Sequence, residues 1–266
     1  MRRLLTVECE GALLGASLDE GVGAPRASGL LMVTGGTQTR IGSHRMYERL
    51  ARQLTAAGYA SLRFDRRGVG DSEGEDPGFR GSGPDLAAAA AAFRKEAPHV
   101  DKLFGFGLCD GATALALHGA AAGLDGLILV NPWLVEAEAG SPAPAAVRSH
   151  YRERLLSLEG WKKLATGAVD WRKLAAGLRR STATGSSPLA GEAAQAMRAR
   201  RLPCAVVLAE RDATAIAARH ELKRREFKGL ISFLQTVPSD SHTFARPGDS
   251  GALFGATLAL LRRLGG

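Results

Sequence analysis

Short, unbroken apolar runs recur along the chain, each bounded by glycine, proline or polar residues. They occupy residues 29–34, 59–64, 103–106, 126–131, 203–209 and 231–237. A run of this length without alternation is typical of a strand that is buried on both faces, as in a parallel sheet. Residues 4–10 and 12–18 instead alternate between apolar and polar positions on either side of Gly11, which predicts an antiparallel pair of strands at the start of the chain.

Segments with helical preferences separate these runs. They cover residues 46–57, 84–96, 112–122, 213–225 and 251–263. Gly58 follows the first of them, at a position where glycine ends helices well, and Pro84 suits the first turn of the second. The alternation of buried strands and helices predicts an α/β fold with a mostly parallel sheet and helices on both faces. In such sheets ligands bind at the carboxyl ends of the strands.

The alternation stops between residues 132 and 199, where no strand-like run occurs. The composition of this stretch predicts a proline-rich loop, helices near 147–157, 160–168, 170–180 and 190–200, and a hinge at 181–187. We therefore expect an α/β core formed by residues 1–131 and 200–266. Residues 132–199 are expected to be inserted in it as a helical lid, over the carboxyl ends of the strands.

The strongest chemical signal is the pentapeptide Gly107-Leu108-Cys109-Asp110-Gly111, which stands between an apolar run and a helix-forming stretch. Gly-x-nucleophile-x-Gly is the pattern of a strained turn whose two glycines let strand and helix approach closely. A thiol at a helix N-terminus faces the positive end of the helix dipole, which favours the reactive thiolate, so we expect Cys109 to be a nucleophile. The alternative is that Cys109 is a small buried apolar side chain, as many free cysteines are.

An acid and a base follow the nucleophile at the ends of two later strands. Asp212 comes shortly after the run at 203–209, and His242 is the one histidine of six that follows a predicted strand late in the chain. The order nucleophile, acid, histidine is that of the α/β-hydrolase fold. We expect His242 to take the thiol proton and Asp212 to orient the imidazole. Asp240 is a second candidate acid, but it lies two residues before His242 and would have to fold back on its own loop.

The predicted site also includes an oxyanion hole. One expected donor is the backbone N–H of Asp110, the residue after the nucleophile. The other is the N–H of Gly36 or Thr37, in the Gly-Gly-Thr-Gln loop that follows the first buried strand.

The charge and the cysteine content of the chain bear on its binding partners and its cellular compartment. The chain carries 35 Lys and Arg against 27 Asp and Glu, a formal net charge of +8, but no nucleic-acid-binding motif accompanies this charge. Its three cysteines have no paired spacing, which favours a reducing compartment, and no segment approaches the roughly 18 apolar residues of a membrane span. We therefore expect a cytoplasmic protein that binds no nucleic acid, spans no membrane and needs no cofactor or metal ion.

Lys and Arg outnumber Asp and Glu within residues 132–199. A basic lid would concentrate anions at the mouth of the site, so anionic substrates are expected to fit best. The alternative is that these basic residues only form a solvated surface.

Taken together, these motifs resemble a known family. The chain is similar to α/β hydrolases along its whole length and, more narrowly, to hydrolase 1 of the exosortase A system, which is encoded beside exopolysaccharide and protein-sorting genes in Gram-negative bacteria. The resemblance is carried by Gly35-Gly36-Thr37-Gln38, Phe64-Asp65-Arg66-Arg67-Gly68-Val69-Gly70-Asp71-Ser72, Gly107-Leu108-Cys109-Asp110-Gly111-Ala112, Asn131-Pro132-Trp133 and Ser241-His242. It implies a hydrolase linked to exopolysaccharide or exosortase systems. Cysteine stands where most α/β hydrolases have serine, a feature shared with dienelactone hydrolases.

The expected activity is that of an acyl hydrolase. It would cleave an ester or thioester of a small-molecule or carrier-bound acyl substrate through a thioester intermediate on Cys109. An acyltransferase is the first alternative, because it needs the same residues and differs only in whether an alcohol, such as a sugar hydroxyl, or water reaches the acyl-enzyme. A non-catalytic scaffold that binds a partner is the second alternative, against which the order of the three residues speaks. The sequence leaves the oligomeric state open.

Overall fold

The computed structural model of the chain describes residues 1–21, 25–136 and 187–265. Their central feature is an eight-stranded sheet with the order β1-β2-β4-β3-β5-β6-β7-β8. The strands are β1 (Arg2–Cys9), β2 (Ala12–Asp19), β3 (Ser28–Val33), β4 (Ala60–Phe64), β5 (Lys102–Leu108), β6 (Gly126–Val130), β7 (Cys204–Ala209) and β8 (Phe233–Val237). β1 pairs with β2, and β2 with β4, in antiparallel fashion, whereas all pairs from β4 to β8 are parallel.

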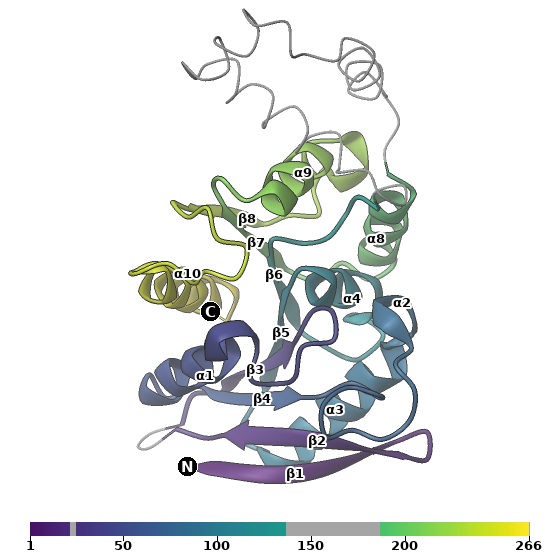
Figure 1. Cartoon of the computed structure of the whole chain (residues 1–266), viewed down its shortest axis with the longest axis vertical. Coiled ribbons are helices and arrows are strands. Elements are labelled where there is room, and N and C mark those ends of the chain that lie inside the picture. The colour runs from purple at the N-terminus through teal and green to yellow at the C-terminus, as the bar shows by residue number, and fades with distance from the viewer. Residues whose placement is uncertain (22–24, 137–186, 266) are drawn as a thin grey trace, which may run out of the picture.

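Helices cover both faces of this sheet. The described helices are α1 (Met46–Ala56), α2 (Gly78–Gly81), α3 (Gly83–Glu96), α4 (Asp110–His118), α8 (Pro188–Ala199), α9 (Ala213–Leu222) and α10 (Asp249–Gly265), with short 3-10 helices η1 (Ser43–Arg45) and η2 (Arg225–Phe227). Figure 1 shows α1 and α10 together on one side of the sheet, and α2, α3, α4 and α8 on the other. The parallel strands therefore end at one common edge, which the connecting loops surround.

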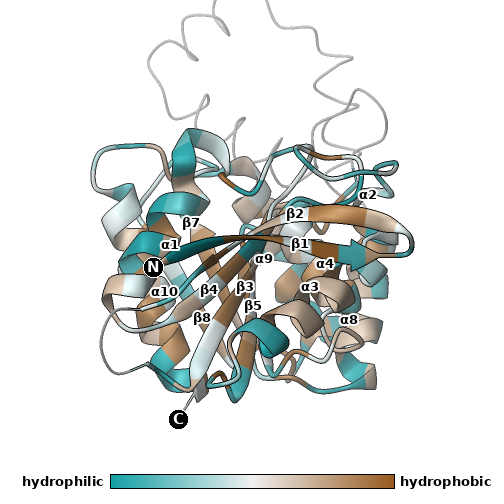
Figure 2. Ribbon diagram, turned by 90° about the horizontal axis from the view of Figure 1, so that it is seen from below, coloured by the Kyte–Doolittle hydropathy of each residue, from teal (hydrophilic) through white to brown (hydrophobic). Residues whose placement is uncertain are grey.

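The core follows from the apolar runs. All residues of β4, β6 and β7 are buried, whereas exposure alternates along the two edge strands β1 and β8. Figure 2 shows apolar residues concentrated along the inner strands. An edge strand has one free side and a solvated face, so alternation marks β1 and β8 as the borders of the sheet.

The expected α/β fold with a mostly parallel sheet and an antiparallel opening is confirmed. Several element ends differ from those predicted. α4 begins at Asp110 and ends at His118, whereas the helix was expected over residues 112–122. The strand expected at 231–237 begins only at Phe233. The short helix α2 was not expected, because its four residues carry no periodic pattern.

Most of the predicted lid lies outside the described residues. Of residues 132–199, the structure describes 132–136 and 187–199. The last helix expected there is present as α8 (Pro188–Ala199), and it packs against α4. The helices expected between 147 and 180 fall outside the described part, so the division into core and lid stays a prediction. Among the helices of the described ranges, none combines the length and apolar character needed to cross a bilayer.

Candidate functional site

Cys109 stands at the tight turn between β5 and α4. Its backbone has φ 60° and ψ −127°, a conformation that side-chain-bearing residues rarely adopt. The flanking glycines make the turn possible: a Cβ on Gly107 would lie 2.6 Å from the Gly111 carbonyl oxygen, and one on Gly111 would lie 2.5 Å from that of Val33. The turn therefore fixes Cys109 at the carboxyl edge of the sheet, where it is half-buried.

The loop after β6 holds this turn in place. The Cys109 N–H donates to the Val130 carbonyl oxygen at 3.0 Å, and the Cys109 carbonyl oxygen accepts from the Trp133 N–H at 3.1 Å. The Thr113 hydroxyl of α4 donates to the Trp133 carbonyl oxygen at 2.7 Å. The Asn131-Pro132-Trp133 turn is thus one of the supports of the candidate nucleophile.

The structure brings His242 and Asp212 together. His242 Nδ1 lies 3.0 Å from Asp212 Oδ2, and the side chain of Asp212 is only 9 % exposed. Asp212 is also the N-cap of α9, where the same Oδ2 accepts from the Ala215 N–H at 2.9 Å. A carboxylate held by a helix N-terminus has a fixed orientation, so it can hold the imidazole in one tautomer.

Asp240 takes no part in this contact. Its carboxylate accepts from Arg246 Nε at 3.0 Å, and its side chain is 44 % exposed. The hydrogen bond from Arg246 lowers the pKa of Asp240. Of the two candidate acids, the structure therefore places Asp212 beside the histidine and Asp240 in a surface ion pair.

Asn131 positions the loop that carries His242, a contact that sequence reasoning missed. This residue is fully buried and has a left-handed backbone with φ 41°. Its amide nitrogen donates to the His242 carbonyl oxygen at 3.0 Å, while its amide oxygen accepts from the Ala209 N–H at 2.8 Å. Asn131 thereby ties the end of β6 to the end of β7 and to the histidine loop. The only signal in the sequence was an asparagine directly after a buried strand.

His242 retains its proton well above neutral pH. Burial, the largest influence, lowers the pKa of His242, but hydrogen bonds to Asp212 and Cys109 and the charges of both residues raise it to about 10. An imidazolium in this position can donate its proton to a leaving group. Burial instead raises the pKa of the Cys9 thiol to about 11 and that of the Cys204 thiol to about 12, which leaves both as inert core side chains.

The expected oxyanion donors lie beside Cys109, but one of them is already engaged. The Gly36 N–H donates to Asp110 Oδ1 at 2.6 Å, and the Gly36 carbonyl oxygen accepts from Arg66 Nη2. Gly36 and Thr37 are both exposed at the surface of the loop after β3. The carboxylate of Asp110 is therefore already bound to one of the N–H groups expected as oxyanion donors, a contact for which the sequence carries no signal.

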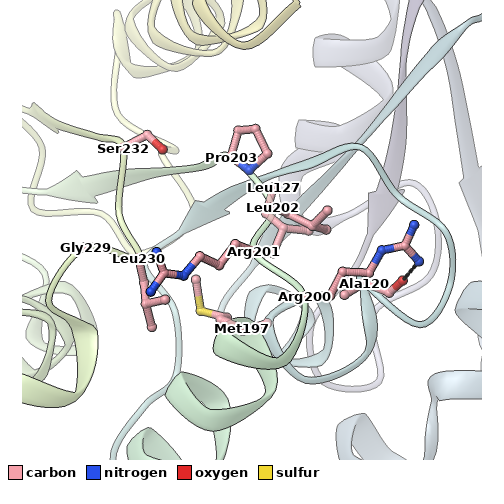
Figure 3. Close-up of a pocket in the computed structure, with 11 residues that line it drawn as sticks. Ala120, Leu127, Met197, Arg200, Arg201, Leu202, Pro203, Gly229, Leu230 and Ser232 are labelled. Atoms are coloured by element: carbon pink, nitrogen blue, oxygen red, sulfur yellow. Dashed lines mark hydrogen bonds between the residues drawn. The ribbon is translucent and has the colours of Figure 1, made fainter.

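The pocket in Figure 3 lies away from this site. Its volume is about 260 Å³, and Leu127, Pro203 and Ser232 line it at or before the starts of β6, β7 and β8. Cys109 follows the carboxyl end of β5 and His242 follows that of β8, at the opposite edge of the parallel sheet, so the pocket is no part of the candidate site. Within the described ranges, no three His, Cys, Asp or Glu residues are grouped as metal ligands would be.

The sequence of the chain matches one protein family. The model of the family described as serine aminopeptidase, S33 (Hydrolase_4) matches residues 38–225, a stretch that includes Cys109 and Asp212 and ends before His242. No curated protein sequence matches the chain.

Solved structures share the fold at low sequence identity. An esterase from Pyrococcus furiosus superposes with a TM-score of 0.66 at 14 % identity, covering 100 % of this chain and 92 % of its own. A dienelactone hydrolase from Anabaena variabilis gives 0.65 at 15 % identity, with 99 % and 98 % covered. A serine hydrolase without a lid from Xanthomonas campestris gives 0.61 at 17 % identity, with 98 % and 94 % covered. At these identities the likeness shows the fold alone.

Proposed function

Because this chain belongs to the Hydrolase_4 (serine aminopeptidase, S33) family of α/β hydrolases, we propose that it is an acyl hydrolase that cleaves esters or thioesters through Cys109. The observation that carries the proposal is the position of His242, which is hydrogen-bonded to Asp212 and whose pKa is raised by both Asp212 and Cys109. A histidine that interacts with an acid on one side and with a nucleophile on the other is the arrangement that nucleophilic acyl transfer requires.

In the acylation step, the Cys109 thiolate attacks the carbonyl carbon of the substrate. A C–S bond forms, and the carbonyl electron pair moves onto the oxygen of a tetrahedral intermediate. The Asp110 N–H at the start of α4 faces this oxygen, with a second N–H from the loop at Gly36 and Thr37. When the intermediate collapses, the bond to the leaving oxygen or sulfur breaks, and the His242 imidazolium supplies the proton that the leaving group takes.

In the deacylation step, His242 works as a base. The now neutral imidazole takes a proton from water while the water oxygen attacks the thioester carbonyl. The C–S bond then breaks, the acid product leaves, and the Cys109 thiolate is restored beside the imidazolium. Asp212 stays ionised throughout, holds the imidazole in one orientation and stabilises its charged form.

Cysteine in place of serine suits this charge arrangement. A serine hydroxyl must lose its proton to the histidine during attack, whereas a cysteine thiolate attacks directly. His242, whose pKa is raised to about 10, keeps a proton for the leaving group. The resemblance to hydrolase 1 of the exosortase A system supports, in addition, a substrate from exopolysaccharide metabolism, such as an acylated sugar or a carrier-bound acyl group.

The test is an activity screen with purified protein on p-nitrophenyl esters of short and long acids and on acyl thioesters, with and without sugar acceptors. We expect Cys109→Ala to abolish turnover and Cys109→Ser to keep part of the esterase activity. Intact-mass measurement during turnover should detect an acyl adduct, which peptide mapping places on Cys109.

Cys204→Ala is the matched control, because it removes a buried thiol away from the site and should leave the rates unchanged. Unchanged turnover in Cys109→Ala, or an adduct on another residue, would contradict the proposed mechanism. Transfer to a sugar that outpaces hydrolysis would assign the chain as an acyltransferase instead.

A further inference from the structure

The Asp110 carboxylate is bound to a backbone N–H of the loop after β3. Its Oδ1 lies 2.6 Å from the Gly36 nitrogen, a short distance that is typical of a charge-assisted hydrogen bond. We propose that Asp110 closes the oxyanion hole of the resting enzyme, and that the substrate carbonyl oxygen displaces its carboxylate from Gly36 before acylation. This inference rests on the proposed hydrolase function and adds a residue that controls its first step.

The fold makes room for this contact. A Cβ at Gly35 would collide with Asp110 Oδ1, so the carboxylate can reach the loop only because Gly35 has no side chain. Asp110 is the first residue of α4, where the helix dipole favours a negative charge. Both features favour the position of the carboxylate at Gly36.

The carboxylate and an oxyanion compete for the same donor. Each is negatively charged and each needs the Gly36 N–H, so the two cannot bind there together without repulsion. The backbone N–H of Asp110 belongs to the first turn of α4, which leaves its N–H groups without acceptors inside the helix. With the carboxylate at Gly36, the Asp110 N–H is therefore available to the substrate oxygen. The Gly36 N–H becomes available only after the Asp110 side chain has moved away.

The loop does not depend on Asp110 for its shape. The Gly36 carbonyl oxygen is held by Arg66 Nη2, and Arg66 is buried, with 2 % exposure. The Thr34 hydroxyl donates to the Gln38 carbonyl oxygen at 2.9 Å, and Gln38 Oε1 accepts from the Ser43 N–H at 3.0 Å. Removing the carboxylate should thus free the Gly36 N–H without releasing the loop.

The kinetic test compares acylation rates with p-nitrophenyl acetate. Because a hydrogen bond to a charged group is the one that must break, we expect Asp110→Ala to raise the acylation rate constant by about tenfold or more. Asp110→Asn, whose amide oxygen still accepts but carries no charge, should give an intermediate rise. A lower rate in both variants would overturn the proposal and make Asp110 a support of the oxyanion hole.

Asp125→Ala is the matched control. Asp125 Oδ2 likewise accepts from a backbone N–H, that of Leu103 at 2.7 Å, but at the start of β5. This substitution should leave the acylation rate unchanged. An equal rise in Asp125→Ala would show that the effect of Asp110→Ala has no connection with Gly36.

A spectroscopic readout separates this proposal from the proposed function. The amide proton of Gly36 in ¹H–¹⁵N spectra of the free protein should lie downfield in the wild type and move upfield in Asp110→Ala, with a smaller move in Asp110→Asn. A Gly36 signal that both variants leave in place overturns the closure even if the protein is an active esterase. A signal that moves as expected in a protein without acyl hydrolase activity supports the closed contact and rejects the proposed function.

Discussion

At the scale of single residues, the charge state of His242 decides what the site can do. Desolvation alone would leave this imidazole neutral at pH 7, but Asp212 and Cys109 together reverse that effect. A protonated histidine beside the nucleophile can act as the general acid that protonates the leaving group. His242 therefore starts the cycle as an imidazolium, which Asp212 stabilises.

Asp212→Asn should lower both the pKa of His242 and the turnover number. The substitution removes a negative charge and a hydrogen bond that raise this pKa, so the imidazole should lose its proton at a lower pH than in the wild type. Loss of an orienting carboxylate typically costs about 10⁴-fold in turnover. The measurements are an NMR titration of the His242 ring protons and kcat with p-nitrophenyl esters.

Asp240→Asn is the matched control for this prediction. It removes a carboxylate from the same loop that pairs with Arg246 and not with the histidine. The titration of His242 and the turnover number should both stay near wild-type values. If Asp240→Asn abolishes activity while Asp212→Asn does not, the assignment of the acid is wrong.

At the scale of elements, the ends of β6 and β7 and the loop after β8 form one support. Asn131 links them through a donor to the His242 carbonyl oxygen and an acceptor for the Ala209 N–H. Asparagine is one of the few residues that tolerate the left-handed backbone required here. The Asn131 side chain thus links β6 to β7 and also positions the loop that carries His242 relative to Cys109.

Asn131→Asp should separate these two tasks. The carboxylate can still accept from the Ala209 N–H, but it cannot donate to the His242 carbonyl oxygen and repels it. We expect a loss of about 1–3 kcal/mol in the free energy of unfolding, measured with urea. A misplaced histidine should also lower kcat by up to about 10²-fold with a smaller change in KM.

Asn131→Gly serves as the comparison, because glycine keeps the left-handed backbone and loses both hydrogen bonds. It should be at least as unstable as Asn131→Asp. Wild-type kcat in Asn131→Asp would mean that the bond to the histidine loop has no role in positioning the imidazole.

The elements and the pairing of His242 with Asp212 were predictable, whereas the contacts of Asp110 and Asn131 were not. Apolar runs identify strands because burial on both faces leaves no polar positions, and strand ends bring Cys109, Asp212 and His242 to one edge. The hydrogen bond between Asp110 and Gly36 joins the turn after β5 to the loop after β3. These two segments are neighbours only because β3 and β5 pair in the sheet. The hydrogen bond between the Asn131 side chain and the His242 carbonyl oxygen likewise joins segments that are far apart in the sequence. No local sequence pattern predicts either contact.

At the scale of the whole molecule, the net charge of +8 should affect the capture of substrate. A positive protein attracts anions at long range, and salt screens this attraction. We expect kcat/KM for p-nitrophenyl hemisuccinate, an anionic ester, to fall as ionic strength rises from about 0.01 M to 0.15 M, where the Debye length shrinks from about 30 Å to 8 Å. Neutral p-nitrophenyl butyrate is the control and should show a flatter dependence. Identical salt curves would mean that the basic residues form a solvated surface with no part in selection.

The pairing of β6 with β7 has a consequence for how the protein is made. β6 ends at Val130, and β7, its neighbour in the sheet, begins only at Cys204. The strand that pairs with β6 is therefore synthesised long after the turn at Cys109. A nascent chain that has emerged only as far as β6 carries Cys109 but lacks Asp212, His242 and the strands that hold them. Its thiol therefore has no imidazolium beside it. The arrangement is complete only when β7 and β8 have joined the sheet, so acyl transfer through Cys109 cannot begin on a chain that ends at β6.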